Sequence, residues 1–138
     1  MDDPKTKLVR AWLSKAQHDL GSAKQLASEP VAYLDTAIYH CQQAAEKSFK
    51  AYLVHRDFPF HKIHNLTVLL GYCIDLDSAF NELSDAAANL TPYATAFRYP
   101  DEFFESEPNQ SEFDDAFKQA ENILAFVLKR VPMASHPE

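Results

Sequence analysis

Three short segments of the sequence gather side chains that bind anions or carry protons, and the first spans residues 39–51. Within it, Gln43, Lys47 and Lys50 recur at intervals of four and three, which places them on one face of an α-helix. An amide and two ammonium groups on one face could contact a phosphate or an acidic partner. The alternative is a solvated helix face. Its i,i+4 pairs would be Gln43 with Lys47 and Glu46 with Lys50.

The second segment is His61-Lys62-Ile63-His64-Asn65, which precedes another apolar periodic stretch. A histidine at the start of a helix could exchange protons near neutral pH or contact an anion. The alternative is a structural role, in which His64 or Asn65 binds the free N–H groups of the first helical turn.

The third segment contains Tyr93 and the run Arg98-Tyr99-Pro100-Asp101. A guanidinium beside tyrosine rings and a rigid proline turn could bind an anion and stack on a base. Alternatively, Arg98 pairs with Asp101 or with carbonyl groups at a helix end, and so fixes the loop.

These segments define the candidate nucleotide- or partner-binding residues, which are Gln43, Lys47, His64, Tyr93, Arg98, Tyr99 and Asp101. No catalytic residue is assigned. The sequence lacks a Gly-rich phosphate loop, a G-x-S-x-G motif, an H-E-x-x-H motif and an EF-hand loop. It also lacks the paired Glu-x-x-His motifs of di-iron bundles. We therefore predict no metal site and no cofactor.

Composition restricts the function further. The formal net charge of -7 works against tight, nonspecific binding of nucleic acid, although it leaves room for a local basic site. Cys41 and Cys73 fall inside apolar helical patterns and are expected to be buried free thiols. The start of the chain is acidic and does not resemble a signal peptide, and no apolar run approaches the ~20 residues of a membrane span. We expect a cytoplasmic protein.

The elements that must position these residues are helices. Only two glycines are present, and apolar residues recur every three or four positions along most of the chain. Long helices are predicted over about 5–27, 33–55 and 109–131, with shorter ones after Asn65, around 80–90 and at Thr91-Pro92. Asn109 and Glu112 fit a capping box. Short connections predict an all-α, up-and-down antiparallel bundle of four to five helices.

We predict one domain over residues 1–138, with a core over about 5–131 and a short disordered tail at 132–138. Residues 100–108 are acidic and bounded by prolines, and we predict that they form a loop. The small residues Ala44, Ala45 and Ser48 would let another helix approach the second helix closely.

In this order, several segments resemble the HEPN family (higher eukaryotes and prokaryotes nucleotide-binding domain), in its stand-alone prokaryotic branch. The resemblance covers about residues 5–131. The matching pieces are Trp12 with Ala16, Asp19 and Leu20, then Cys41-Gln42-Gln43-Ala44-Ala45-Glu46-Lys47 with Lys50-Ala51, then His64-Asn65-Leu66, and finally Arg98-Tyr99-Pro100-Asp101.

The resemblance implies a helical bundle that pairs as a homodimer. Family members are often encoded with a minimal nucleotidyltransferase, in pairs similar to toxin–antitoxin modules. Catalytic members are metal-independent ribonucleases that carry an arginine, a spacer of four to six residues and a histidine late in the domain. There, the arginine would stabilise phosphate charge and the histidine would transfer protons.

The sequence departs from that ribonuclease motif. After Arg98, the positions where the histidine should fall are Phe103, Phe104 and Glu105. The literal match runs from Arg56 to His61, in the loop after the second helix. The sequence therefore leans away from an enzyme.

We expect a binding and interaction module that binds a nucleotide, or RNA, or acts with a nucleotidyltransferase partner. Its residues Lys47, His64, Arg98, Tyr99 and Asp101 would surround one cleft. Two alternatives stay open. One is a ribonuclease toxin built on Arg98 or on Arg56 with His61, and the other is a purely structural regulatory dimer.

Overall fold

The structure is a computed structural model that describes residues 2–28, 30–97 and 107–138. Within these ranges it holds five α-helices and no strand, which confirms the predicted all-α bundle. The helices are α1 (Pro4–Ser28), α2 (Leu34–His55), α3 (Leu66–Leu76), α4 (Ser84–Leu90) and α5 (Gln110–Leu128). Short 3-10 turns are η1 (Ser78–Leu83), η2 (Thr91–Ala94) and η3 (Met133–Ser135). Across the described ranges, no helix is long and apolar enough to cross a membrane.

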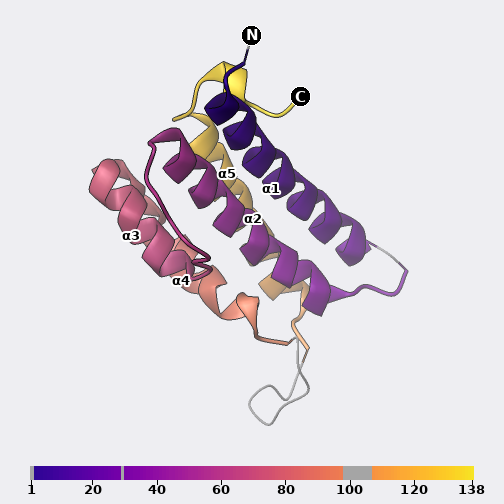
Figure 1. The fold of residues 1–138 in the computed structure, drawn as a ribbon. Helices are drawn as coiled ribbons and strands as arrows, with labels where there is room; N and C mark the ends of the chain where they lie inside the picture. The colour runs from indigo at the N-terminus through magenta and orange to yellow at the C-terminus, as the bar shows by residue number, and fades with distance from the viewer. Residues whose placement is uncertain (1, 29, 98–106) are drawn as a thin grey trace.

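Helix α2 lies at the centre of the bundle (Figure 1). It packs against α1 along one side and against α5, and it meets α3, α4 and η2 on its remaining faces. Helices α1 and α2 form an antiparallel pair, and the two chain ends lie at the same end of the bundle. Any polar side chain on α2 is therefore close to a neighbouring element.

The loop at residues 56–65 folds back along α2 before α3 begins. The start of α3 is level with the middle of α2, because His64 Nδ1 lies 3.0 Å from Glu46 Oε2. The end of α3 is level with the end of α2, because Arg56 Nη1 donates to the Leu76 carbonyl at 3.3 Å. Helix α3 thus runs in the same direction as α2, which departs from a strict up-and-down order. This return brings His64 against the middle of α2.

Aromatic rings fill the core between α2, η1 and α5. Phe80 is fully buried, and its ring centroid lies 4.4 Å from that of Tyr52, 4.8 Å from that of Phe126 and 6.4 Å from that of Phe49. Such tilted arrangements are favourable for aromatic pairs. Helix α2 also buries small residues, since Ala44, Ala45 and Ser48 are all fully buried.

Local capping chemistry fixes the helix starts as the sequence predicts. The Asn65 side chain accepts hydrogen bonds from the backbone N–H groups of Thr67 and Val68, at 2.9 and 3.2 Å. Asn109 and Glu112 form the capping box that opens α5. Asn65, and not His64, is therefore the cap of α3, which leaves the His64 ring available for other contacts.

Residues 132–138 differ from the expected disordered tail. Helix α5 ends at Leu128, earlier than predicted, and η3 then folds the chain back so that Ser135 is buried. His136 Nε2 lies 2.8 Å from the Leu128 carbonyl oxygen, and Arg10 donates to the Ala134 carbonyl. The His136 contact satisfies a carbonyl group at the end of α5, and the Arg10 contact ties η3 to α1, so the tail is held at two points.

Both cysteines are buried and free, as predicted. Burial raises the pKa of the Cys41 thiol and of the Cys73 thiol to about 12. Neither is a nucleophile at neutral pH, because the thiolate is the reactive form.

The Phe80→Ala variant should lose about 3–5 kcal/mol of unfolding free energy, because it leaves a cavity among three other rings. Urea unfolding measures this directly. Leu8→Ala is the matched control, since Leu8 is exposed and should change stability by less than ~0.5 kcal/mol. Equal losses in the two variants would contradict the assignment of Phe80 to the core.

Stability should also fall on the acid side because of His55. Burial, followed by the positive charges of Lys5 and Arg56, lowers the pKa of His55 below its ordinary 6.5. As the pH falls below 6.5, the unfolded chain takes up a proton that the folded chain resists, so the folded state loses stability. His55→Gln should therefore lose less stability than the wild type between pH 7.5 and pH 5.5. Identical losses in urea titrations would refute this origin.

Candidate binding site

A hollow of about 440 Å³ opens between α1, α2, the returning loop and η2, and we call it the cleft. Its lining residues are Trp12 from α1, Tyr39, Gln43, Glu46, Lys47 and Lys50 from α2, His64 from the loop and Ala94 from η2. Its volume lies within the range of roughly 300–1,000 Å³ that is typical of small-molecule sites. The predicted residues Gln43, Lys47 and His64 are therefore brought together.

The helical repeat of α2 explains why one helix supplies five lining residues. Positions 39, 43, 46 and 50 follow one another at intervals of four and three, and position 47 lies four after position 43. These intervals are close to one helical turn, so the five side chains share one face. Trp12 on α1 and His64 on the loop then close the two sides of this face.

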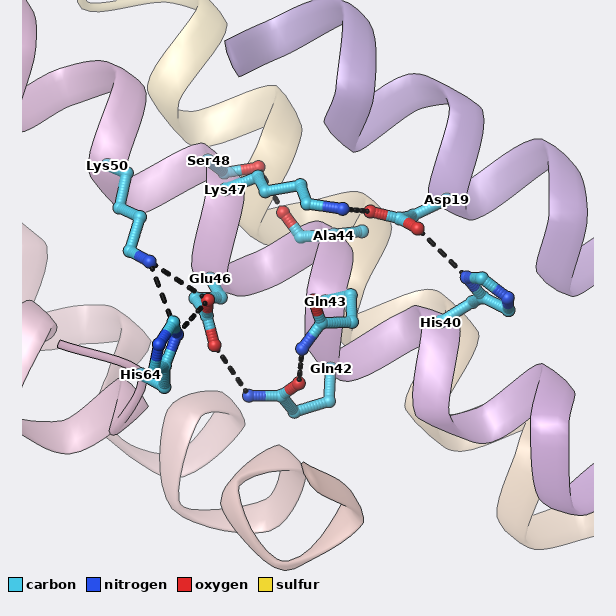
Figure 2. Close-up of polar contacts among 10 residues, drawn as sticks. All are labelled: Asp19, His40, Gln42, Gln43, Ala44, Glu46, Lys47, Ser48, Lys50 and His64. Atoms are coloured by element: carbon cyan, nitrogen blue, oxygen red, sulfur yellow. Dashed lines mark hydrogen bonds and ion pairs between the residues drawn. The ribbon is translucent and has the colours of Figure 1, made fainter. Parts of the chain in front are cut away.

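A buried ion pair forms the floor of the cleft. Lys50 Nζ lies 3.0 Å from Glu46 Oε2, and each side chain is only 5% exposed. Gln42 Nε2 donates to the second carboxylate oxygen, Oε1, at 3.4 Å (Figure 2). The predicted i,i+4 pair from Glu46 to Lys50 is confirmed, but its placement on a solvated face is wrong. The loop at residues 56–65 covers the pair. The periodic pattern of α2 could not predict this, because the cover comes from another segment of the chain.

Two aromatic rings complete the surroundings of Lys50. Its ammonium lies 5.4 Å from the centroid of the Trp12 ring and 5.8 Å from that of the Phe60 ring. Both distances are within the range of cation–π attraction. Lys50 is therefore held between a carboxylate and two ring faces, and its charge is compensated inside the protein.

His64 lies at the rim of the cleft, with 69% of its side chain exposed. Its Nδ1 atom is 3.0 Å from Glu46 Oε2 and 3.5 Å from Lys50 Nζ. A carboxylate only accepts hydrogen bonds, so the shorter contact assigns the proton to Nδ1 in the neutral ring. The other ring nitrogen, Nε2, is then the acceptor of the neutral ring.

A second buried carboxylate, Asp19 on α1, organises the other side. Its Oδ2 atom lies 2.5 Å from Lys47 Nζ, and its Oδ1 atom lies 2.8 Å from His40 Nδ1 (Figure 2). Asp19 and His40 are not among the candidate binding residues predicted from the sequence. The available signal was a charged residue on the apolar stripe of the first helix, since a buried carboxylate needs a partner.

The remaining predicted residues are distributed differently. Gln43 Nε2 donates to Gln42 Oε1 at 2.7 Å, not to Lys47. Tyr93 is half-buried, lines a separate hollow of about 190 Å³ beside α5, and stacks on Phe97 with ring centroids 6.1 Å apart. Burial, helped by the nearby charge of Glu112, raises the pKa of Tyr93. The other three predicted residues, Arg98, Tyr99 and Asp101, lie outside the described residues.

Arg56, the arginine of the literal match to the ribonuclease motif, has a structural role. Arg56 Nη1 donates to the Tyr52 hydroxyl at 2.6 Å and to the Leu76 carbonyl at 3.3 Å. Its guanidinium therefore fastens the end of α3 to the end of α2. His61 is exposed in the returning loop.

Tyr39 also lines a neighbouring hollow of about 270 Å³, together with Asp35, Thr36, His40 and Phe97. Among the residues that the structure describes, no group of three or more His, Cys, Asp and Glu side chains is arranged to hold a metal ion.

Comparison with known proteins adds a family. The sequence model of the HEPN domain matches residues 9–131. The chain is similar to the solved structure of ST0689, an archaeal HEPN homologue, with 26% identity and a TM-score of 0.72 over 90% of this chain and 98% of that chain. It is also similar to TT1696 from Thermus thermophilus, with 28% identity and a TM-score of 0.74 over 91% of this chain and 99% of that chain. The comparison with curated protein sequences gave no match.

Removing one member of the buried ion pair should be costly. Glu46→Gln leaves Lys50 buried without its counter-charge, and we expect a loss of about 3–5 kcal/mol in urea unfolding. The double variant Glu46→Leu with Lys50→Met removes both charges and should lose much less. Lys5→Ala is the control, because its pair with Asp57 is solvent-exposed and should contribute less than ~1 kcal/mol. A loss below that value for Glu46→Gln would refute a buried pair.

Proposed function

The chain belongs to the HEPN domain family, and on this basis we propose that it is a binding module whose cleft holds a nucleotide. The observation that carries the proposal is the composition of the cleft. Aromatic side chains, an amide, a lysine and a histidine converge on a hollow of about 440 Å³.

Each part of a nucleotide has a suitable partner in the cleft. The rings of Trp12 and Tyr39 offer apolar faces on which a base can stack. The Lys47 ammonium is 23% exposed and can donate a charge-assisted hydrogen bond to a phosphate oxygen. Asp19 already holds Lys47 in place, so binding costs less side-chain entropy than it would for a free surface lysine.

The charge of the cleft limits the strength of this interaction. Lys47 faces Asp19 and Lys50 faces Glu46, so the two pairs are neutral while the histidines are neutral. Recognition then rests on shape, stacking and local donors, and not on a strong positive field. This agrees with the net charge of -7, which disfavours nonspecific binding to RNA.

The wider assembly is part of the same proposal. Family membership supports a homodimer, since HEPN domains often pair, and a toxin–antitoxin-like system with a nucleotidyltransferase partner. Because the family match covers residues 9–131, we treat the chain as one HEPN unit. Arg98, Tyr99 and Asp101 stay predicted contributors to binding. We do not base a ribonuclease proposal on Arg56, because its donors hold α3.

A thermal-shift and calorimetry screen with AMP, ATP, GTP and a short RNA tests the nucleotide site. A ligand that binds only the native state at 100 times its Kd stabilises it by about 2.7 kcal/mol, so a specific ligand should raise Tm clearly. Lys47→Gln should weaken that binding about tenfold or more, because it removes a charge-assisted contact.

Lys118→Gln is the matched control, since it removes the same charge from an exposed position on α5. It should bind like the wild type. If none of the four ligands shifts Tm, the nucleotide proposal fails, and a co-purifying partner protein becomes the next object of search. An Arg98→Ala variant, run in parallel, tests whether the predicted arginine contributes.

A further inference from the structure

Two charge triplets of the same composition lie in and beside the cleft, and Asp19 and His40 are not among its lining residues. In each, a buried carboxylate contacts one lysine and one histidine: Asp19 contacts Lys47 and His40, and Glu46 contacts Lys50 and His64. Figure 2 shows the two triplets on opposite sides of the α2 face. In each triplet the lysine cancels the carboxylate, so the histidine decides whether the triplet carries a net positive charge.

Neither lysine offers a ligand an uncompensated positive charge, because each is paired with a buried carboxylate. Lys50 is 5% exposed and is enclosed by Glu46, Trp12 and Phe60. Lys47 can reach a ligand, but moving it fully away from Asp19 would weaken the compensation of a buried carboxylate, which is costly.

His64 differs from the two lysines, because a ligand can reach it and because it can gain a charge without losing its contact with Glu46. Most of its ring is exposed, it lines the cleft, and its Nδ1–H is directed at Glu46. The ring becomes a cation by taking a proton at Nε2, without breaking the Nδ1 contact. Histidine is also the side chain whose charge most readily changes near neutral pH.

We infer that entry of a phosphate monoester into the cleft is coupled to uptake of one proton from solvent at Nε2 of His64, which makes the imidazolium the group that counters the bound anion. This rests on the proposed nucleotide function and adds its regulation by pH. No covalent bond to the ligand forms, and the proton returns to solvent on release.

The charged groups that face His64 favour its protonation only when an anion is bound. From α2 it faces the Glu46 carboxylate and the Lys50 ammonium, which largely cancel. Lys47, also on α2, lines the same cleft, while α1 contributes the uncharged Trp12. On its own loop, His61 and Lys62 are exposed to solvent, which screens them. The phosphate therefore adds the unbalanced negative charge that stabilises the imidazolium.

The sign of the effect follows from this linkage. A complex that holds one more proton than the free partners is weakened as the pH rises, because protons become scarcer. The nucleotide affinity should therefore fall between pH 6.5 and pH 8.5. AMP itself works in the opposite direction if the dianion is preferred, since its second ionisation near pH 6 supplies more dianion as the pH rises.

Calorimetric proton counting separates proton uptake at His64 from the ionisation of AMP. AMP is titrated at pH 7.5 in Pipes and in Tris, whose ionisation enthalpies differ, and the difference in heat gives the protons taken up per bound AMP. We expect a clear fractional uptake in the wild type. His64→Gln should abolish the uptake and weaken binding about tenfold, because glutamine preserves a donor to Glu46 but cannot become a cation. His61→Gln, a neighbouring exposed histidine, should retain both.

The outcomes test the nucleotide site and the coupling at His64 separately. If no nucleotide binds, the proposed function fails. If AMP binds without proton uptake, or if uptake persists in His64→Gln, the coupling at His64 is overturned and the nucleotide site stands. A sulfate monoester of adenosine, which does not titrate near neutrality, provides the last arm. Uptake with AMP that persists in His64→Gln and is absent with the sulfate ester would assign the proton to the ligand and would also overturn the inference.

Discussion

The burial of α2 is the constraint on which the rest of the structure depends. Thirteen of its 22 residues are buried, and they include Gln42, Glu46 and Lys50 as well as apolar side chains. A charge inside a protein is tolerated only when it is paired and hydrogen-bonded. Two ion pairs of α2 meet this requirement. Glu46 pairs with Lys50 on the same helix, and Lys47 pairs with the buried Asp19 on α1.

The cleft is a by-product of those pairings. Glu46 and Lys50 require polar and aromatic cover, and the loop at residues 56–65 supplies it by folding back along α2 with Phe60 and His64. That return leaves an accessible hollow beside the covered pair, because the loop does not fill the groove between α1 and α2. Stability and binding therefore depend on the same carboxylates, and a change at Asp19 or Glu46 will affect both.

Features governed by local chemistry could be read from the sequence. The capping box of Asn109 depends on residues within one turn of each other, and the structure confirms it. The cap of α3 is equally local: the sequence left His64 and Asn65 as candidates, and Asn65 is the cap. The burial of Glu46 and Lys50 could not be read this way, because it depends on a loop that returns from fourteen to eighteen positions further along the chain, as the Glu46–His64 and Lys50–His64 contacts show. The same holds for Asp19, whose partners are on another helix, and for residues 132–138, which are held by α1 and α5.

The two inert thiols offer a way to observe motions of the bundle. Cys41 is buried on α2, whereas Cys73 is buried on α3, with its sulfur 4.0 Å from the Phe49 carbonyl oxygen. A thiol-specific alkylating reagent reacts with neither until the surrounding helices separate. Because the two sulfurs lie on different helices, their separate alkylation rates report whether α3 detaches from α2 before the α1–α2 pair opens, which resolves the cooperative units of the fold without any added probe.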